Sequence, residues 1–182
     1  DENLIYKDEE QYYSEKILKF PRIWNSHSGF KFDRNYNLSP VNVNKFITFG
    51  SFGNFRKISD DTIEVWSKIL NNVRGSKLIL KSSINFHTDS LLNKFEKFGV
   101  EDQIKIINRL NFKDIKDHLD LYNLIDIGLD TFPYNGVTTT FEALWMGVPV
   151  ITMKGYNFNS RCGESILKNS GLNYLIGSDK KN

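Results

Sequence analysis

The sequence predicts an α/β fold of the doubly wound, Rossmann-like class, in which a parallel sheet lies between two layers of helices. From Lys45 onward, short continuous apolar runs alternate with longer segments whose apolar residues recur at helical spacing, and this unit repeats five times. Such runs are typical of strands buried on both faces, and strands that alternate with helices pair in parallel through right-handed crossovers. The length of 182 residues suits one buried core rather than two full domains.

Each unit supplies one strand and one helix. The expected strands are residues 45–51, 77–81, 103–108, 124–130 and 148–153, and the later four helices cover residues 88–98, 114–123, 139–146 and 160–169. Ser59 is expected to cap the first helix, and Gly147 and Gly171 to end the last two. The residues expected to face the core are Ile63, Trp66, Leu70 and Val73 in the first helix, and Leu91, Leu92, Phe95 and Phe98 in the second.

Residues 1–44 lack this periodicity. The segment 12–21, YYSEKILKFP, is predicted to form a strand or a short helix, and the polar, proline-punctuated stretch after it is typical of a linker. We therefore expect the domain itself to cover residues 45–182.

Composition and charge exclude several classes of protein. The 24 basic and 22 acidic residues leave a formal net charge of +2, so no broad positive field is expected to hold nucleic acid. Cys162 is the only cysteine, which excludes an internal disulfide, suits a reducing cytosol and is expected to be a small buried thiol. No apolar run is long enough to cross a bilayer, and the acidic start does not look like a signal peptide. A cytoplasmic protein without membrane contact is expected.

Ligands of an open parallel sheet bind beyond the carboxyl ends of its strands. Five connecting segments lie there, residues 52–57, 82–87, 109–113, 131–140 and 154–161, and the fourth carries the most chemistry. After Pro133, Asn135 and Gly136 it enters a helix at VTTT, residues 137–140. Free amides and the helix dipole make such a start a natural phosphate seat, although neither GxGxxG nor GxxxxGK[ST] is present.

Thr139 and Glu142 have two interpretations. T-x-x-E is the signature of a capping box, which needs no ligand, and spacing alone favours it. Alternatively, Glu142 accepts hydrogen bonds from the hydroxyls of a ribose, as an acidic residue does in dinucleotide-binding folds.

Lys57 and His118 are weaker signals. Lys57 lies just before Ser59, within reach of a ligand at the sheet edge, and His118 lies one helical turn from Tyr122, but such residues are more often solvated or partly buried. His27 and His87 lie in polar loops and are not expected to act. No histidine cluster or carboxylate pair predicts a metal site, and no Ser-His-Asp order predicts a hydrolase.

Taken together, the residues resemble a known family, the O-linked N-acetylglucosamine transferases and their SPINDLY-type relatives, over residues 12–176. The matching segments are FITFGSFGNFRKI, EVWSKIL, GLNYLI and the long run HLDLYNLIDIGLDTFPYNGVTTTFEALWMGVPVITM. The resemblance implies a GT-B architecture of two Rossmann-like halves, of which this chain is the C-terminal one. Residues 1–44 would then be the end of the N-terminal half and a linker, and the domain would be truncated at its C-terminus.

The resemblance also implies roles for residues. Lys57 falls on the lysine that contacts the donor's diphosphate and supports its departure, and Asn54 on a nearby polar donor-site position. Thr138 and Thr139 match the groups that hold the phosphates, while His118 matches the histidine beside the nucleobase and Glu142 the carboxylate that binds ribose.

Two positions depart from the animal enzymes of the family. Val137 replaces a histidine that precedes the threonines, and Ile115 lies where a lysine approaches the base. Lys113 and Lys116 are the candidate replacements for that lysine.

The activity implied is an inverting, metal-independent transfer of a sugar to protein Ser or Thr hydroxyls, with UDP-GlcNAc the favoured donor and GDP-fucose an alternative. Implied partners are the upstream catalytic half, without which this chain is expected to be inactive, and tetratricopeptide repeats. Two other possibilities stay open: a nucleotide-binding or scaffold module that does not catalyse, and an unrelated α/β ligand-binding domain with an ordinary capping box.

Overall fold

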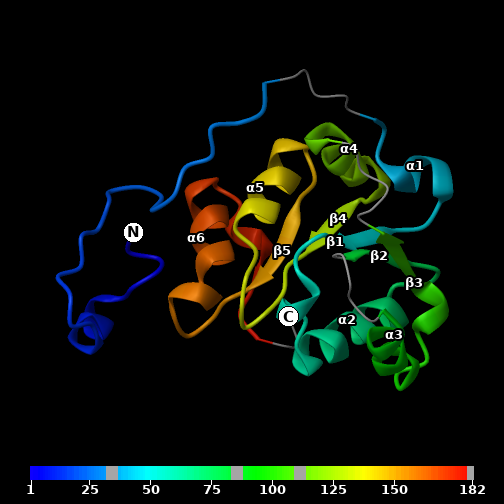
Figure 1. The fold of residues 1–182 in the computed structure, drawn as a ribbon, viewed down its shortest axis with the longest axis horizontal. Coiled ribbons are helices and arrows are strands. Elements are labelled where there is room, and N and C mark those ends of the chain that lie inside the picture. Colours follow the sequence, from blue (N-terminus) through cyan, green and yellow to red (C-terminus); the bar gives the residue numbers. More distant parts are fainter. Residues whose placement is uncertain (32–36, 83–87, 109–113, 180–182) are drawn as a thin grey trace.

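The protein is described by a computed structural model, which defines residues 1–31, 37–82, 88–108 and 114–179 (Figure 1). Its core is one sheet of six parallel strands in the order β3-β2-β1-β4-β5-β6. The strands are β1 (Thr48–Ser51), β2 (Lys77–Ser82), β3 (Ile104–Asn108), β4 (Ile127–Leu129), β5 (Val150–Met153) and β6 (Ile176–Gly177). The order reverses between β1 and β4, so the predicted doubly wound, Rossmann-like class is confirmed.

Helices cover both faces of the sheet. They are α1 (Pro40–Asn44), α2 (Asp60–Asn72), α3 (Thr88–Glu96), α4 (Ile115–Asp120), α5 (Thr138–Trp145) and α6 (Cys162–Asn169). Figure 1 shows α2 and α3 together on one side and α4, α5 and α6 on the other. The two largest buried clusters follow this division, because neighbouring β2 residues point to opposite faces: Leu78 and Leu80 pack toward α2 and α3, and Ile79 toward α4 and α5.

The predicted ends of several helices are confirmed. The Ser59 hydroxyl accepts a hydrogen bond from the Thr62 amide at 3.1 Å and caps α2. Gly147 and Gly171 adopt φ angles of +79° and +74°, the left-handed conformation that terminates α5 and α6. These helix ends depend on a capping side chain or on a glycine within the same few residues, so they can be predicted from the sequence.

The expected strand or helix over residues 12–21 is wrong. The 3-10 helix η1 (Lys7–Tyr12) ends where that element is expected to begin, and residues 13–20 have no regular structure. Leu18 is 80% exposed and Phe20 56% exposed, and only Ile17 packs against a buried cluster, so the segment buries too little apolar surface to stabilise a short helix.

Other differences concern boundaries. Phe98, which the pattern places in the core, is 40% exposed, because α3 ends at Glu96 and leaves Phe98 beyond the helical face. The helix expected over residues 114–123 divides into α4 and the 3-10 helix η5 (Leu121–Leu124). β1 and β4 begin three residues later than the pattern suggests, and β6 is too short to leave a periodic signal.

Candidate functional site

The loops after β1 and β4 meet where the strand order reverses, the place at which open α/β sheets bind ligands. The first loop carries Lys57 at the end of the 3-10 helix η2 (Phe55–Lys57), and the second leads into α5. The Lys57 ammonium donates a hydrogen bond to the Asn135 carbonyl oxygen at 2.9 Å, which joins the two loops directly. An open cleft of about 330 Å³, within the range of small-molecule sites, lies along this junction.

Lys57 is a half-buried cation at the inner side of the cleft. Its ammonium lies 4.2 Å from the centroid of the Tyr134 ring, within the range of a cation–π contact. Burial lowers the pKa of Lys57, and the nearby Asp130 carboxylate and Cys162 thiol oppose that shift. A partly desolvated cation attracts an anionic ligand more strongly than a fully hydrated one does.

The start of α5 faces the same cleft. Val137, Thr138 and Thr139 line it together with Lys57. The helix begins at Thr138, and the Thr140 and Phe141 amides donate to the Val137 carbonyl oxygen, which leaves the Thr138 and Thr139 amides without an acceptor within the helix and without a side-chain cap. The structure therefore combines free amides, the positive end of a helix dipole and a lysine at one place, the composition of an anion seat.

The capping-box interpretation of Thr139 and Glu142 is wrong. Val137, not Thr139, precedes the first residue of α5, and the Glu142 carboxylate turns away from the helix start. Its Oε2 accepts a hydrogen bond from the Tyr122 hydroxyl at 3.0 Å and lies 3.0 Å from Nε2 of His118.

Tyr122 connects this carboxylate to the anion seat. Its hydroxyl also lies 3.2 Å from the Thr139 carbonyl oxygen, and burial and the charge of Glu142 raise the pKa of Tyr122 well above its ordinary value. The Lys81 ammonium, at the carboxyl end of β2, lies 3.1 Å from Nδ1 of His118. Four side chains from four elements, β2, α4, η5 and α5, thus converge beside the start of α5.

The remaining predicted residues are less central. Asn54 lines the cleft, where its side chain accepts a hydrogen bond from the Arg56 amide and caps η2. Lys113 lies outside the described residues, as do His87 and most of the loops 82–87 and 109–113. Lys116 pairs with Asp120 of its own helix at 2.6 Å, and Ile115 is 48% exposed.

Sequence reasoning missed one wall of the cleft. Trp24, from the segment interpreted as a linker, packs edge-on against Phe158 at 4.9 Å, and both line the cleft beside Cys162. Burial raises the pKa of the Cys162 thiol to about 11, which fits the expected inert thiol. Asp130 and Asn135 were also missed as organising residues, because no motif distinguishes them from ordinary turn residues.

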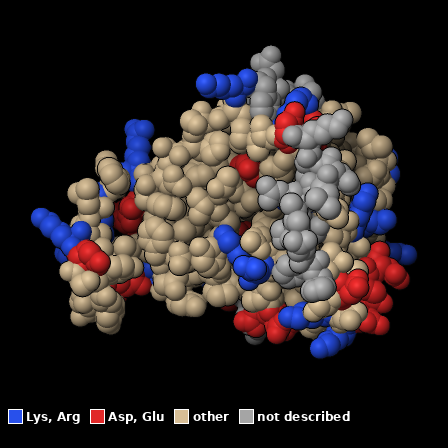
Figure 2. All heavy atoms as spheres, in the orientation of Figure 1, with Lys and Arg blue, Asp and Glu red and all other residues tan. Residues whose placement is uncertain are grey.

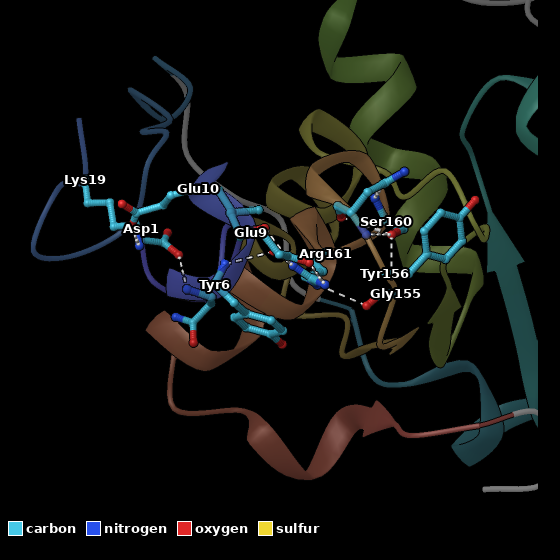
Figure 3. A network of polar contacts seen from close by, with 12 residues as sticks. Asp1, Tyr6, Glu9, Glu10, Lys19, Gly155, Tyr156, Ser160 and Arg161 are labelled. Atoms are coloured by element: carbon cyan, nitrogen blue, oxygen red, sulfur yellow. Dashed lines mark hydrogen bonds and ion pairs between the residues drawn. The ribbon is translucent and has the colours of Figure 1, made fainter. Parts of the chain in front are cut away.

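Residues 1–24, hereafter the N-terminal arm, dock on the loop between β5 and α6 through Arg161, which is only 4% exposed (Figure 3). The guanidinium forms a two-pronged ion pair with Glu9, at 2.6 and 2.7 Å, and donates to the Leu4 and Gly155 carbonyl oxygens. The Tyr6 ring lies 3.9 Å from it. The pairing lowers the pKa of Glu9 to about 2. The arm therefore packs against the domain through a buried ion pair.

Charges of both signs are interspersed on the face seen in Figure 2, with most of them over α2 and α3. Among residues 1–31, 37–82, 88–108 and 114–179, no three His, Cys, Asp or Glu side chains gather as a metal site would require. Over the same residues, no helix has the length and apolar character needed to span a membrane.

Comparisons with known proteins identify the family of this chain. The family model described as Glycosyl transferase family 41 matches residues 34–182. The probable UDP-N-acetylglucosamine-peptide N-acetylglucosaminyltransferase SPINDLY of Arabidopsis thaliana is 40% identical over 147 residues, 78% of this chain and 16% of that protein. Its relative in Eustoma exaltatum subsp. russellianum is 35% identical over 178 residues, 95% of this chain and 19% of that protein.

A solved structure of a mutant O-GlcNAc transferase from Thermobaculum terrenum superimposes with a TM-score of 0.86 at 28% identity, covering all of this chain and 34% of that one. The fold and this match define the class: the chain is a Rossmann-like domain of a GT-B glycosyltransferase. It belongs to glycosyl transferase family 41, the family of the O-GlcNAc transferase and SPINDLY-type enzymes. The chain spans less than a fifth of the length of these curated relatives.

Proposed function

We propose that this chain is the nucleotide-sugar-binding domain of an inverting, metal-independent protein O-glycosyltransferase. The observation that carries the proposal is the convergence of Lys57 with the uncapped start of α5 in one cleft. UDP-GlcNAc is the donor we favour, because the SPINDLY relatives are named for it, and GDP-fucose is the alternative. The acceptor we propose is a Ser or Thr hydroxyl of a protein, held with the help of a further catalytic half.

The diphosphate of the donor would lie against the start of α5. Thr138 and Thr139 offer amides and hydroxyls there, and Lys57, whose ammonium bonds the Asn135 carbonyl oxygen, lines the same cleft. These groups supply the positive charge that the diphosphate needs as the bond between the sugar and its phosphate oxygen breaks. They therefore assist the leaving group, while the incoming hydroxyl attacks the anomeric carbon from the opposite side.

The nucleoside would extend toward Glu142. Its carboxylate is one helical turn beyond the phosphate seat, a spacing that suits a ribose attached to the diphosphate. Tyr122 and His118 engage one carboxylate oxygen, Oε2, so Oε1 is the oxygen we assign to the ribose hydroxyls. His118, next to Lys81, would then lie beside the base.

Isothermal titration calorimetry of the protein with UDP and GDP tests this assignment. One of the two nucleotides is expected to bind, and Lys57→Ala is expected to weaken it about 10- to 100-fold, the usual loss of a charge-assisted contact. Arg56→Ala is the matched control, because Arg56 is a neighbouring exposed cation outside the residues that line the cleft, and it should leave the affinity within about twofold.

The assignment is refuted if neither nucleotide binds, or if Lys57→Ala and Arg56→Ala have equal effects. Titration with UDP-GlcNAc and GDP-fucose then identifies the donor. Since the chain spans only 16% of its Arabidopsis relative, a nucleotide-binding module that does not catalyse is the second candidate. Donor binding without sugar transfer to peptide by the protein that carries this chain would favour that second candidate.

A further inference from the structure

Asp130, which follows the last residue of β4, is a buried carboxylate with three hydrogen-bond donors around it. Its Oδ1 accepts from the Thr131 amide at 2.9 Å and from the Gly136 amide at 2.6 Å. Its Oδ2 accepts from the Thr152 hydroxyl of β5 at 2.8 Å. Oδ1 thus holds together the two ends of the loop between β4 and α5, and residues 130–136 form a hydrogen-bonded ring.

This ring determines where the anion seat lies. Asn135, inside the loop, offers its carbonyl oxygen to Lys57 and accepts a hydrogen bond from the Gly163 amide of α6 at 3.2 Å. A side chain at Gly163 would come within 2.6 Å of Oδ2 of Asp130, so no bulkier residue fits there. The groups that contact the Asp130 carboxylate therefore come from the β4–α5 loop, β5 and α6.

The charge of Asp130 acts on the same cleft. Asp130 lines a smaller pocket of about 30 Å³, and Lys57 and Thr139 line both this pocket and the cleft. Burial is the main cause that raises the pKa of Asp130 to about 6, while its three hydrogen bonds and the Lys57 ammonium oppose the shift. Cys162 of α6 also faces it, and Asp179 lines a small cavity on the other side of the sheet with it. An ionised Asp130 is thus the counter-charge of Lys57 while the cleft is empty.

Thr152 provides a place for a proton. A hydroxyl is both donor and acceptor, so a proton on Oδ2 can be donated to Oγ1 of Thr152 once that hydroxyl turns its own hydrogen away. Oδ1 then keeps both loop amides, and the ring stays closed. Protonation removes the negative charge without opening the loop.

We propose that Asp130 is a proton-linked positioning residue of the diphosphate seat: ionised, it balances Lys57 in the empty cleft, and it takes up a proton from solvent when the donor's diphosphate replaces it as counter-charge. This inference rests on the proposed function. Two negative phosphates beside a buried carboxylate oppose its ionisation, so donor binding and proton binding favour each other.

Calorimetry with a nucleotide sugar tests the coupling, because the diphosphate of UDP-GlcNAc or GDP-fucose does not itself titrate near neutral pH. The wild type is titrated with whichever of the two binds, in two buffers of different ionisation enthalpy. We expect uptake of up to about one proton per donor bound, and an affinity that falls up to about tenfold as the pH rises from 6 to 8.

Asp130→Asn should bind the donor with no proton uptake and with a flat pH dependence, because the amide keeps the loop contacts and donates to Thr152. Asp126→Asn is the matched control at the other end of β4, where Asp126 accepts from the Val41 and Thr48 amides far from the cleft, and it should retain the wild-type uptake. Histidines also titrate between pH 6 and 8. The test is therefore the difference between Asp130→Asn and Asp126→Asn, rather than the pH dependence of the wild-type affinity alone.

Thr152→Val removes a hydrogen bond that favours the ionised carboxylate, so it should move the proton uptake to higher pH, and it tests the inference even where Asp130→Asn does not fold. Donor binding by the wild type without proton uptake, or unchanged uptake in Asp130→Asn, overturns the inference and leaves the proposed function intact. A wild type that binds neither nucleotide sugar overturns the proposed function, and this inference with it.

Discussion

Glu142 illustrates how one carboxylate can be assigned to a ligand by the contacts it already makes. Tyr122 and His118 both approach Oε2, and among the described parts of the chain no group donates to Oε1. A buried acceptor whose second oxygen is left for a ligand is typical of a binding residue rather than a helix cap.

Replacement of Glu142 by Gln tests the ribose contact. The wild type should bind UDP or GDP about tenfold or more tightly than the 2′,3′-dideoxy form of the same nucleotide, because a hydrogen bond to a charged group is lost in the analogue. Glu142→Gln should bind both forms with similar affinity. Glu64→Gln, an exposed member of an ion pair on α2, is the control and should preserve the wild-type preference. A full preference in Glu142→Gln would remove Glu142 from the site.

At the scale of elements, the start of α5 depends on close packing around Gly136. A β-carbon there would lie 2.4 Å from Oγ1 of Thr139, closer than such atoms approach, and 3.2 Å from Oδ1 of Asp130, a tight contact. The loop and the first turn of α5 leave no space for a side chain, which is why a glycine precedes the helix.

Gly136→Ala should therefore destabilise the fold by about 1–3 kcal/mol, the usual cost of overpacking, as measured by urea unfolding. Gly53→Ala is the control, because its β-carbon would meet no atom within 4 Å, and it should change the free energy of unfolding by less than about 0.5 kcal/mol. If both variants lost the same free energy of unfolding, the first turn of α5 would have moved to accommodate the added methyl group.

At the scale of the whole molecule, the N-terminal arm and α6 form one unit with the sheet (Figures 1 and 3). Asp1 accepts from the Ser165 hydroxyl and the Trp24 amide, and Leu4 and Ile5 are buried against Cys162. Because Trp24 belongs to the arm and to the cleft wall, detachment of the arm would also open the cleft.

Glu9→Gln should weaken this docking by about 1–2 kcal/mol at neutral pH, since it leaves the buried Arg161 without its counter-charge. The folded-state pKa of Glu9 is lowered, to about 2, so its stabilisation is complete above the ordinary glutamate pKa and is lost as the pH falls from about 4.5 to about 2. Urea unfolding of wild type and variant should therefore differ at pH 7 and converge in acid.

Glu10→Gln provides the comparison for that experiment. Glu10 pairs with Lys19 at the surface of the same arm, where an exposed pair contributes about 0–1 kcal/mol. If the two variants were equally stable at neutral pH, the Arg161 pair would not be what holds the arm.

Features determined by neighbours in the chain could be predicted. The alternation of apolar runs and helical spacing indicates the parallel sheet, and Ser59 and Gly147 mark helix ends, since both signals arise within a few residues. The family resemblance, rather than spacing, predicted Lys57, Thr138, Thr139, His118 and Glu142 as site residues, whereas spacing alone favoured a capping box for Thr139 and Glu142. The element expected over residues 12–21 did not form, since Leu18 and Phe20 are exposed and only Ile17 of its apolar side chains packs against a buried cluster.

The sequence by itself determined the order of strands and helices and the chemistry at their ends. The spacing of apolar residues and the capping of helices both depend on residues within one or two turns of each other. Only the tertiary structure decided which distant side chains meet: Lys57 with Asn135, Lys81 with His118, and Glu9 with Arg161. It also turned Asp130, an ordinary acid after a strand, into a buried carboxylate with a raised pKa. Such contacts depend on how crossovers bring the strand ends together, and no periodicity along the chain records that.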